Sequence, residues 1–358
     1  MTFGIEEEFM LLDPRRLTPV DLGRRVVDDL RGDGAGEVAR EFFCSQIEYA
    51  TPVCETVADA EDALLGFRRR LAQWAADAGV VAAGTGTPIQ AARHPAVSSG
   101  ERYARVATDV GALADDHQIN GLHVHVGIPD RDTGVQASNT LRPWLPVLLA
   151  LSANSPFWDG AETGYDSWRA IHSRRWTTYG VPPRFRDADD YDRTVAKLIG
   201  VGATSDEGTI NWTVRLSSKY PTLEVRVCDA QLDPSASVAL AAIIRALVGT
   251  AAMHEPDRTP DAPADAALWH AARFGLGTTL VHPLTGRPAP SREVLRVLHD
   301  RTAPLLREDN ERAAVDAFLR RAVNGAAFQR RAAASGTPAL ALLFGESLTT
   351  LREGATAG

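Results

Sequence analysis

The sequence has few cysteines, no long apolar run and no signal-like beginning, and each absence excludes a class of protein. Its 358 residues include three cysteines, Cys44, Cys54 and Cys228, with no CxxC pair. Such sparse use argues against a disulfide framework and indicates a reducing compartment. No stretch of about 20 apolar residues is free of charge, and no basic segment leads into an apolar run at the N-terminus. We therefore expect a soluble, cytoplasmic protein without a signal peptide or a membrane-spanning helix.

Basic residues are also scarce relative to acidic ones. The chain carries 38 Lys and Arg against 46 Asp and Glu, for a net charge of −8. A nucleic-acid or anionic-membrane partner favours a basic surface, so we expect neither. The phosphate loop G-x-x-x-x-G-K-[ST] is missing as well. If the protein uses a nucleotide, it holds the phosphates in another way, through metal ions or a few placed arginines.

The apolar pattern predicts strands in the first two-thirds of the chain and helices later. Spacings of three and four predict a helix from Thr56 to Ala78, capped by Thr56 and Asp59 and ended by Gly79. We expect further helices at Leu141–Leu151 and from Ser235 to the end, with an exposed Pro- and Asp-rich loop from His254 to Asp265. Strands are expected at Phe3–Leu12, Gln46–Ala50, Val80–Ala83, Ile119–Ile128, Thr209–Leu216 and Thr222–Asp229, the last two paired across a turn around Ser217–Pro221.

This distribution favours an α+β fold with a mainly antiparallel sheet covered by helices on one side. A regular βαβ rhythm is missing, and so is a long low-complexity linker. We expect a single domain over residues 1–358, with a mainly helical part from about 235 to 358.

Two carboxylates share one face of the first expected strand. Side chains alternate along a strand, so Glu6 and Glu8 point one way while Ile5, Glu7 and Phe9 point the other. Paired carboxylates repel and are costly to desolvate unless a cation lies between them, and hard oxygen ligands suit Mg²⁺ or Mn²⁺. The alternative is a solvated acidic edge strand.

Two imidazoles share a face in the same way on the strand that contains Leu122-His123-Val124-His125-Val126-Gly127. His123 and His125 lie opposite the apolar side chains of that strand. An isolated H-x-H is more often structural than metal-binding, and it also occurs in zinc hydrolases.

Charged residues on the last expected strands complete the polar surface. Glu224 and Arg226 share a face, which by itself is typical of a surface ion pair. Arg215 on the preceding strand and Lys219 in the turn add positive charge, while Glu41 and Glu48 lie seven residues apart. Taken together, these strands predict an acidic metal-binding surface on a sheet, with an arginine available for phosphate and no nucleophile elbow.

Nearly the whole chain resembles the YbdK-type carboxylate–amine ligases, the glutamate–cysteine ligase type-2 family. The motifs that carry this resemblance occur in order: Gly4-Ile5-Glu6-x-Glu8, QIEYAT, GTGTP, ERYARV, GLHVHVG, LSANSPFWDG and TLEVRVCD. The chain departs from the family at Arg215-Leu216-Ser217, where the family often has Arg-Pro-Ser. It fits the family only loosely over Ser167–Trp176, a region that we expect to shape substrate recognition.

The resemblance implies a glutamine-synthetase-like catalytic domain, also shared with guanidino kinases, in which a curved antiparallel sheet holds Mg²⁺ or Mn²⁺ between ATP and substrate. It implies that Arg226 neutralises the transferred phosphoryl group, that Arg215 also binds phosphate, and that His125 contacts nucleotide or substrate. Because Lys219 adds positive charge nearby, we expect it to bind the nucleotide as well. The metal ligands that it implies are Glu6, Glu8, Glu41, Glu48, His123 and Glu224.

The implied reaction joins a carboxylate to an amine through an acyl phosphate, with ATP as co-substrate. Glutamate, through its γ-carboxyl, and cysteine or another small amine are the expected small-molecule substrates, and a homodimer is the expected assembly. Three alternatives stay open from the residues alone: a guanidino-kinase-like phosphotransferase, a zinc hydrolase that uses His123 and His125, and a non-catalytic binding protein on the same fold.

Overall fold

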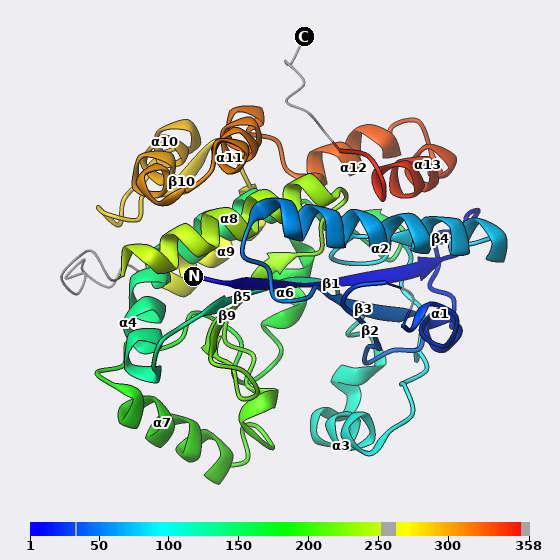
Figure 1. Cartoon of the computed structure of the whole chain (residues 1–358). Helices are drawn as coiled ribbons and strands as arrows, with labels where there is room; N and C mark the ends of the chain where they lie inside the picture. The colour runs from blue at the N-terminus through cyan, green and yellow to red at the C-terminus, as the bar shows by residue number, and fades with distance from the viewer. Residues whose placement is uncertain (33, 252–262, 352–358) are drawn as a thin grey trace.

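A sheet of seven antiparallel strands organises the chain. The computed structural model describes residues 1–32, 34–251 and 263–351 (Figure 1). The strand order is β2-β3-β1-β5-β9-β8, and β4 pairs with the end of β1 at Met10–Leu12. The strand bounds are Phe3–Leu12 for β1, Glu37–Arg40 for β2, Gln46–Ala50 for β3, Val81–Ala83 for β4, Gly121–Gly127 for β5, Val214–Leu216 for β8 and Thr222–Asp229 for β9. The α+β fold with a mainly antiparallel sheet is confirmed.

Two long helices cover one face of this sheet. In Figure 1, α2 (Val57–Ala78) and α8 (Pro234–Thr250) lie across β1 and its neighbours. The side chains of Ile5 and Phe9 are 1% and 0% exposed and belong to the main hydrophobic cluster, as period-two alternation requires. The opposite face, which carries the charged side chains, is therefore available for a site.

The helix α2 begins and ends as its sequence predicts. The Thr56 side chain accepts from the Asp59 backbone N–H, and the Asp59 carboxylate accepts from the Thr56 backbone N–H, which makes a capping box. Gly79 ends the helix with φ of 68°, a left-handed conformation that glycine adopts without a Cβ penalty.

The prediction of one continuous helix at Leu141–Leu151 is wrong, because prolines interrupt it. The structure has α4 (Arg131–Leu141), a 3-10 turn at Arg142–Trp144, and α5 (Leu145–Ser152). Pro143 and Pro146 lack the N–H that a continuous helix needs and clash with the preceding turn. The strand expected from Thr209 is also shorter, because Glu207–Thr209 forms a 3-10 turn held by Thr209 and Asp206.

Helices are not confined to one side of the sheet, contrary to expectation. In Figure 1, α3 and α7 lie below the sheet, opposite α2 and α8. These helices and several short elements were not expected because each lacks a long apolar stripe. They are α1 (Gly23–Leu30), α3 (Glu101–Val110), α6 (Trp168–Ser173), α7 (Ala188–Gly200), β2, and the strand pair β6 (Phe157–Trp158) and β7 (Ala161–Glu162).

The C-terminal part is mainly helical, as expected, with one exception. Its helices are α9 (Ala264–Phe274), α10 (Ser291–Thr302), α11 (Asp309–Arg321), α12 (Gly325–Ala333) and α13 (Thr337–Ser347), with a 3-10 turn at Ala303–Leu305. The antiparallel pair β10 (Thr279–Val281) and β11 (Pro288–Pro290) was not expected. The expected loop His254–Asp265 lies mostly outside the described residues, and its last two residues begin α9.

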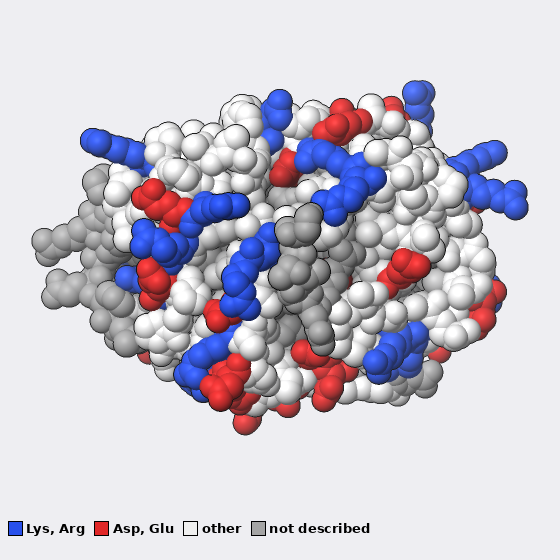
Figure 2. Space-filling view, turned by 90° about the horizontal axis from the view of Figure 1, so that it is seen from above, with Lys and Arg blue, Asp and Glu red and all other residues white. Residues whose placement is uncertain are grey.

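Charged side chains of both signs are interspersed over the face seen from above in Figure 2. In the described part of the chain, no helix has both the length and the apolar character needed to cross a bilayer.

Candidate active site

The register of the sheet gathers the charged residues of separate strands into one patch. Glu6 pairs with His123, and Glu8 pairs with Glu48. On β9, Glu224 has neighbours on both sides, His125 on β5 and Arg215 on β8. Residues that lie far apart in the sequence therefore meet on the face that α2 and α8 leave uncovered.

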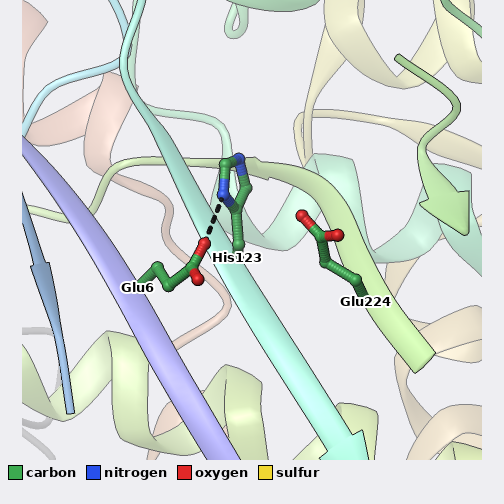
Figure 3. Close-up of side chains that lie close together, drawn as sticks. All are labelled: Glu6, His123 and Glu224. Carbon is green, nitrogen blue, oxygen red and sulfur yellow. Dashed lines mark hydrogen bonds and ion pairs between the residues drawn. The ribbon is translucent and has the colours of Figure 1, made fainter. Parts of the chain in front are cut away.

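One group of three possible metal ligands spans three strands. Glu6, His123 and Glu224 each present a ligand atom within 4.8 Å of the other two. Figure 3 shows the three side chains converging above the sheet, with the His123 Nδ1 to Glu6 Oε2 contact of 3.1 Å drawn as a dashed line. His125 Nε2 lies 3.2 Å from the other oxygen of Glu6, and its Nδ1 lies 2.9 Å from the Thr222 hydroxyl.

A second group shares the same histidine. Glu8, Glu48 and His123 also present ligand atoms within 4.8 Å of one another. One oxygen of Glu8 accepts from the Gly121 backbone N–H at 2.6 Å, and the other lies 3.7 Å from His123 Nε2. Glu41, which follows β2, belongs to neither group but lines the same cavity as Glu8.

Burial and neighbouring charges shift the pKa values of these carboxyl groups. Burial, and then the charge of Glu41, raise the pKa of Glu8 to about 8. Burial also raises the pKa of Glu41, and it holds the pKa of Glu48 well above its usual range together with the charges of Glu6 and Glu41. Burial alone would raise the pKa of Glu6, but the two histidines beside its carboxylate lower it. Carboxyl groups this crowded gain from a bound cation.

The imidazole between the two groups is neutral at pH 7. Burial, and then the charge of Arg226, lowers the pKa of His123 to about 4. A neutral ring has a lone pair available for a metal, which a protonated ring lacks.

Glu224 accepts hydrogen bonds from two arginines, which differ in whether their other donors are occupied. Arg215 donates from Nε at 2.8 Å and Nη2 at 3.3 Å to Glu224, and its Nη1 donates to the Gly208 and Ile210 carbonyls. Arg226 donates to Glu224 through Nη1 alone. Burial opposes ionisation of Glu224, but the two arginines hold its pKa below the usual range. Arg215 is therefore occupied by protein groups, whereas Nε and Nη2 of Arg226 have no hydrogen-bond partner among the described residues.

An irregularity in β9 directs Arg226. The pairs Leu122–Cys228 and Val124–Val225 leave two residues of β9, Arg226 and Val227, opposite the single residue His123. Such a bulge changes the direction of a side chain next to a site. Here it brings Nη1 of Arg226 to 3.5 Å from His123 Nδ1.

The patch opens into a cavity of about 590 Å³. This volume lies within the usual range of ligand sites, about 300–1,000 Å³. Glu8, Glu41, His123 and Arg226 line it from the sheet, and Arg102, Tyr103, Val106 and Val110 line it from α3. Much of the remaining wall comes from the segments 169–179 and 199–211, and Phe42, Gln46, Leu113, His117 and Ile119 also line the cavity. The cavity therefore joins the metal-ligand face to the loosely fitting segment identified in the sequence.

Arg169, which sequence reasoning missed, lies beside the metal-ligand face. Its side chain is buried, lines the cavity and donates to the Arg226 and Val227 carbonyls, while its Nε has no partner among the described residues. A Cβ on Gly121 would lie 2.5 Å from Arg169 Nη2 and 3.1 Å from His123 Nε2. Only glycine at position 121 allows this approach. The sequence signal was the segment Ser167–Trp176, which was expected to shape substrate recognition without a role for Arg169 itself.

A buried carboxylate holds the segment that carries Arg169. Asp229 accepts from the Asn154 backbone N–H at 2.9 Å, from the Ser155 hydroxyl at 2.6 Å and from the Ser167 hydroxyl at 2.8 Å. The LSANSPFWDG and TLEVRVCD motifs therefore meet in space, and their contact fixes the start of α6.

The outer part of the cavity carries an aromatic and basic group. Arg175 donates to Asp116 at 2.6 Å and lies 2.8 Å from His172 Nδ1, and Trp176 donates to His117. Burial, and then the charge of Arg175, lowers the pKa of His172 to about 4 and holds that of His117 well below its usual value. Both rings are neutral at pH 7.

The Lys219 side chain makes no contact with the other candidates in the interactions of the described residues. It is exposed in the Ser217–Pro221 turn, and Tyr220 beside it packs edge-on to His125 at 6.2 Å. Lys219 is not among the residues that line the cavity.

The donor set is suited to a hard divalent cation. Carboxylate oxygens with one imidazole nitrogen suit Mg²⁺ or Mn²⁺, whereas zinc sites of hydrolases favour additional His or Cys ligands. The His125 Nε2 atom is buried and makes no hydrogen bond of acceptable geometry within the described residues. The residues present therefore fit the metal that the sequence predicted.

Solved structures share the fold. The glutamate–cysteine ligase of Francisella tularensis in complex with AMP matches 98% of this chain and 89% of its own, with a TM-score of 0.72 and 14% identity. A bifunctional glutathione synthetase from Pasteurella multocida matches 97% of this chain with a TM-score of 0.70 and 16% identity. This chain spans about half of that protein, 52% of its length. At these identities the likeness concerns the fold alone.

Relatives by sequence share a much larger fraction of identical residues with this chain than the solved structures do. A protein of Saccharopolyspora erythraea, provisionally named glutamate–cysteine ligase 2-2, is 39% identical over 94% of this chain and 90% of its own length. A Salinispora tropica protein, provisionally named glutamate–cysteine ligase 2, is 41% identical over 92% and 90%. The family model of glutamate–cysteine ligase family 2 matches residues 2–343. The expected family and the expectation of a ligase are both confirmed: this chain belongs to the glutamate–cysteine ligase family 2.

Proposed function

We propose that this ligase uses ATP and Mg²⁺ to join the γ-carboxyl of glutamate to a small amine such as cysteine. The observation that carries the proposal is the pair of metal-ligand groups beside an arginine fork with free donors, at the end of a cavity large enough for the substrates. Family membership and the named relatives support the choice of acid and amine.

A carboxylate is a poor acceptor for an amine because its oxygen is a poor leaving group. Transfer of the ATP γ-phosphoryl group to the carboxylate gives an acyl phosphate and ADP. The amine then attacks the carbonyl carbon, the bond to the phosphate oxygen breaks, and the amine gives up a proton. When bound, Mg²⁺ supplies charge neutralisation and alignment of the phosphates.

The chain's own residues provide position and charge. We propose that Glu6, Glu8, Glu48, His123 and Glu224 hold the metal, with Glu41 near them. Arg226 directs Nε and Nη2 at the transferred phosphoryl oxygens, where preorganised donors lower the barrier without reorganisation. Arg215 orients Glu224, and His125 orients Glu6.

Arg169 is the residue that we propose for a second anionic group. Its positively charged side chain lines the cavity, which suits a carboxylate of either substrate. The expectation that Ser167–Trp176 shapes substrate recognition is supported by the position of Arg169, Arg175 and Trp176 on the cavity wall.

A covalent cysteine route has no support in the geometry. Burial raises the pKa of Cys228 to about 12 and raises that of Cys54 as well. None of the three cysteines is among the described residues that line the cavity. The acyl phosphate route needs no protein nucleophile.

A screen of ADP release tests this proposal. Carboxylic acids and amines are supplied in pairs with ATP and Mg²⁺, and the products are identified by mass spectrometry. We expect ADP release to require both substrates, and we expect an amide product. ADP release with a single substrate and a stable phosphorylated product would favour the phosphotransferase alternative, and amine-independent hydrolysis with bound zinc would favour the hydrolase.

The cytoplasmic location and the homodimer stay predictions. Light scattering on the purified chain tests the dimer, with twice the chain mass of 38.5 kDa as the expected result.

A further inference from the structure

A buried ion pair lies directly beneath the proposed metal ligands. Glu7 stands between Glu6 and Glu8 on β1, but its side chain points to the opposite face, where it is 1% exposed. Arg68 of α2 is 0% exposed and donates from Nε at 2.8 Å and Nη2 at 2.7 Å to the two oxygens of Glu7. The Ser237 hydroxyl of α8 donates to the same carboxylate.

The same guanidinium also holds the chain that follows β9. Arg68 Nη1 donates to the Leu232 carbonyl at 2.9 Å, and Nη2 donates to the Gln231 carbonyl at 3.0 Å. Gln231 in turn donates to the Asp229 and Ser152 carbonyls, both at 2.7 Å. One side chain therefore ties the centre of β1 to the end of the strand that carries Glu224 and Arg226.

This arrangement constrains the metal ligands through the backbone. Because side chains alternate along a strand, holding Glu7 on the helix-covered face of the sheet holds Glu6 and Glu8 on the opposite face. A shift of β1 by one residue would move each of these three side chains to the other face. β1 and β9 do not pair directly, since β5 lies between them. The Arg68 contacts supply a direct link from β1 to the segment after β9 across the buried face.

A gain in the free energy of folding does not by itself explain the presence of this buried ion pair. Removing two charges from water is costly, and replacement of a buried pair by apolar residues of similar volume is often neutral or stabilising. A buried pair is better explained when its fixed geometry has a use, and here the nearest groups that need fixed geometry are the ligands on either side of Glu7.

We propose that the Glu7–Arg68 pair is a positioning element that sets the affinity of the site for divalent metal. This inference rests on the metal site of the proposed function. Groups that orient metal ligands without touching the metal typically change affinity by about 10–100-fold when they are replaced.

The chain offers a matched control. Arg245 of α8 and Glu311 of α11 form a second buried pair, 4% and 1% exposed. Arg245 also donates to a backbone carbonyl, that of Glu55 at 3.0 Å, and lies over an aromatic ring, as Arg68 does. This pair joins helices, and it makes no contact with the strand segment Glu6–Glu8 among the contacts described.

The test compares the double variants Glu7→Leu/Arg68→Met and Arg245→Met/Glu311→Leu. Binding of Mn²⁺ is followed by electron paramagnetic resonance without substrates, and Tm is measured without metal. We expect the Glu7/Arg68 variant to fold with a lower Tm, because the Leu232 and Gln231 carbonyls lose their donor, and to bind Mn²⁺ about 10–100-fold more weakly. The Arg245/Glu311 variant should also have a lower Tm, since the Glu55 carbonyl loses its donor. We expect the Arg245/Glu311 variant to bind Mn²⁺ like the parent.

Equal Mn²⁺ affinity in the Glu7/Arg68 variant and the parent would overturn the inference and leave the proposed function intact. If the parent itself binds no Mn²⁺, both fail together. Glu7→Gln is the second variant, since it keeps the side-chain volume if the double replacement does not fold. It should weaken Mn²⁺ binding about tenfold, and parent-like affinity in folded Glu7→Gln protein would also overturn the inference.

Discussion

Replacing Arg226 by lysine tests whether this arginine acts in catalysis or only pairs with Glu224. Arg226 uses Nη1 to bind Glu224, and its Nε and Nη2 remain for two parallel hydrogen bonds to a phosphoryl group. A lysine ammonium at this position would pair with the buried Glu224 carboxylate, and it has no planar fork to present to a second anion. The charge of the site is conserved, so the substitution removes geometry rather than charge.

The expected magnitude follows from the kind of contact that is lost. One preorganised contact to developing charge is worth about 10²–10³ in kcat, or about 2.7–4 kcal/mol of barrier. We therefore expect Arg226→Lys to lower kcat by about 100-fold or more, and to change the KM for ATP much less, because the contact strengthens in the transition state.

Steady-state kinetics with saturating metal measure this effect, and an exposed arginine provides the control. Arg193 pairs with Asp190 at 3.3 Å at the surface and is 51% exposed. Arg193→Lys should leave kcat unchanged, because an exposed pair contributes little. A near-normal kcat in Arg226→Lys would refute the assignment of Arg226 to phosphoryl transfer.

Three further predictions address the metal site. Glu6→Gln and Glu224→Gln should each abolish Mg²⁺-dependent turnover while they keep shape, and parent-like rates in both would exclude the proposed ligands. His123→Ala should abolish activity with little change in the Tm of the metal-free protein, whereas Val124→Asp should unfold the protein by burying an unpaired charge. Circular dichroism measures both effects. If His123→Ala unfolds the protein and Val124→Asp does not, the two faces of β5 have been assigned the wrong way round. A raised carboxyl pKa favours the folded state at low pH, whereas the lowered pKa values of His117, His123 and His172 destabilise it below their usual value of about 6.5. The Tm of metal-free protein should therefore fall as pH rises from about 6.5 to 8, the pKa of Glu8. Mg²⁺ should reverse this fall, and a pH-independent Tm by calorimetry would contradict the pKa shift.

The faces of the strands could be predicted from the sequence because alternation is a local property. Glu6 and His123 were assigned to the polar faces of their strands, and the structure places them together through the β1–β5 register. The pairing itself came only from the family resemblance, since no local signal brings residue 6 to residue 123. The prolines at 143 and 146 were a local signal of the break between α4 and α5, and the apolar run outweighed them in the expectation.

Residues whose role depends on distant partners could not be predicted. Arg68 is one of three consecutive arginines in the sequence, and nothing local distinguishes it from the other two; it is fully buried because Glu7 and the chain after β9 surround it. Arg169 belongs to a segment that fits the family loosely, and its position depends on the buried Asp229 network. The helix α3 carries only a short apolar stripe, Tyr103, Val106 and Val110, and none of its residues is fully buried, so its position depends on distant elements.

The transfer of oxygen from the acid to phosphate tests the central claim most directly. Glutamate labelled with ¹⁸O in the γ-carboxyl group is incubated with ATP, Mg²⁺ and the amine, and the released phosphate is analysed by mass spectrometry. An acyl phosphate requires one labelled oxygen in phosphate for each amide formed, because the C–O bond breaks when the amine attacks. Unlabelled phosphate beside a labelled amide product would contradict the proposed reaction.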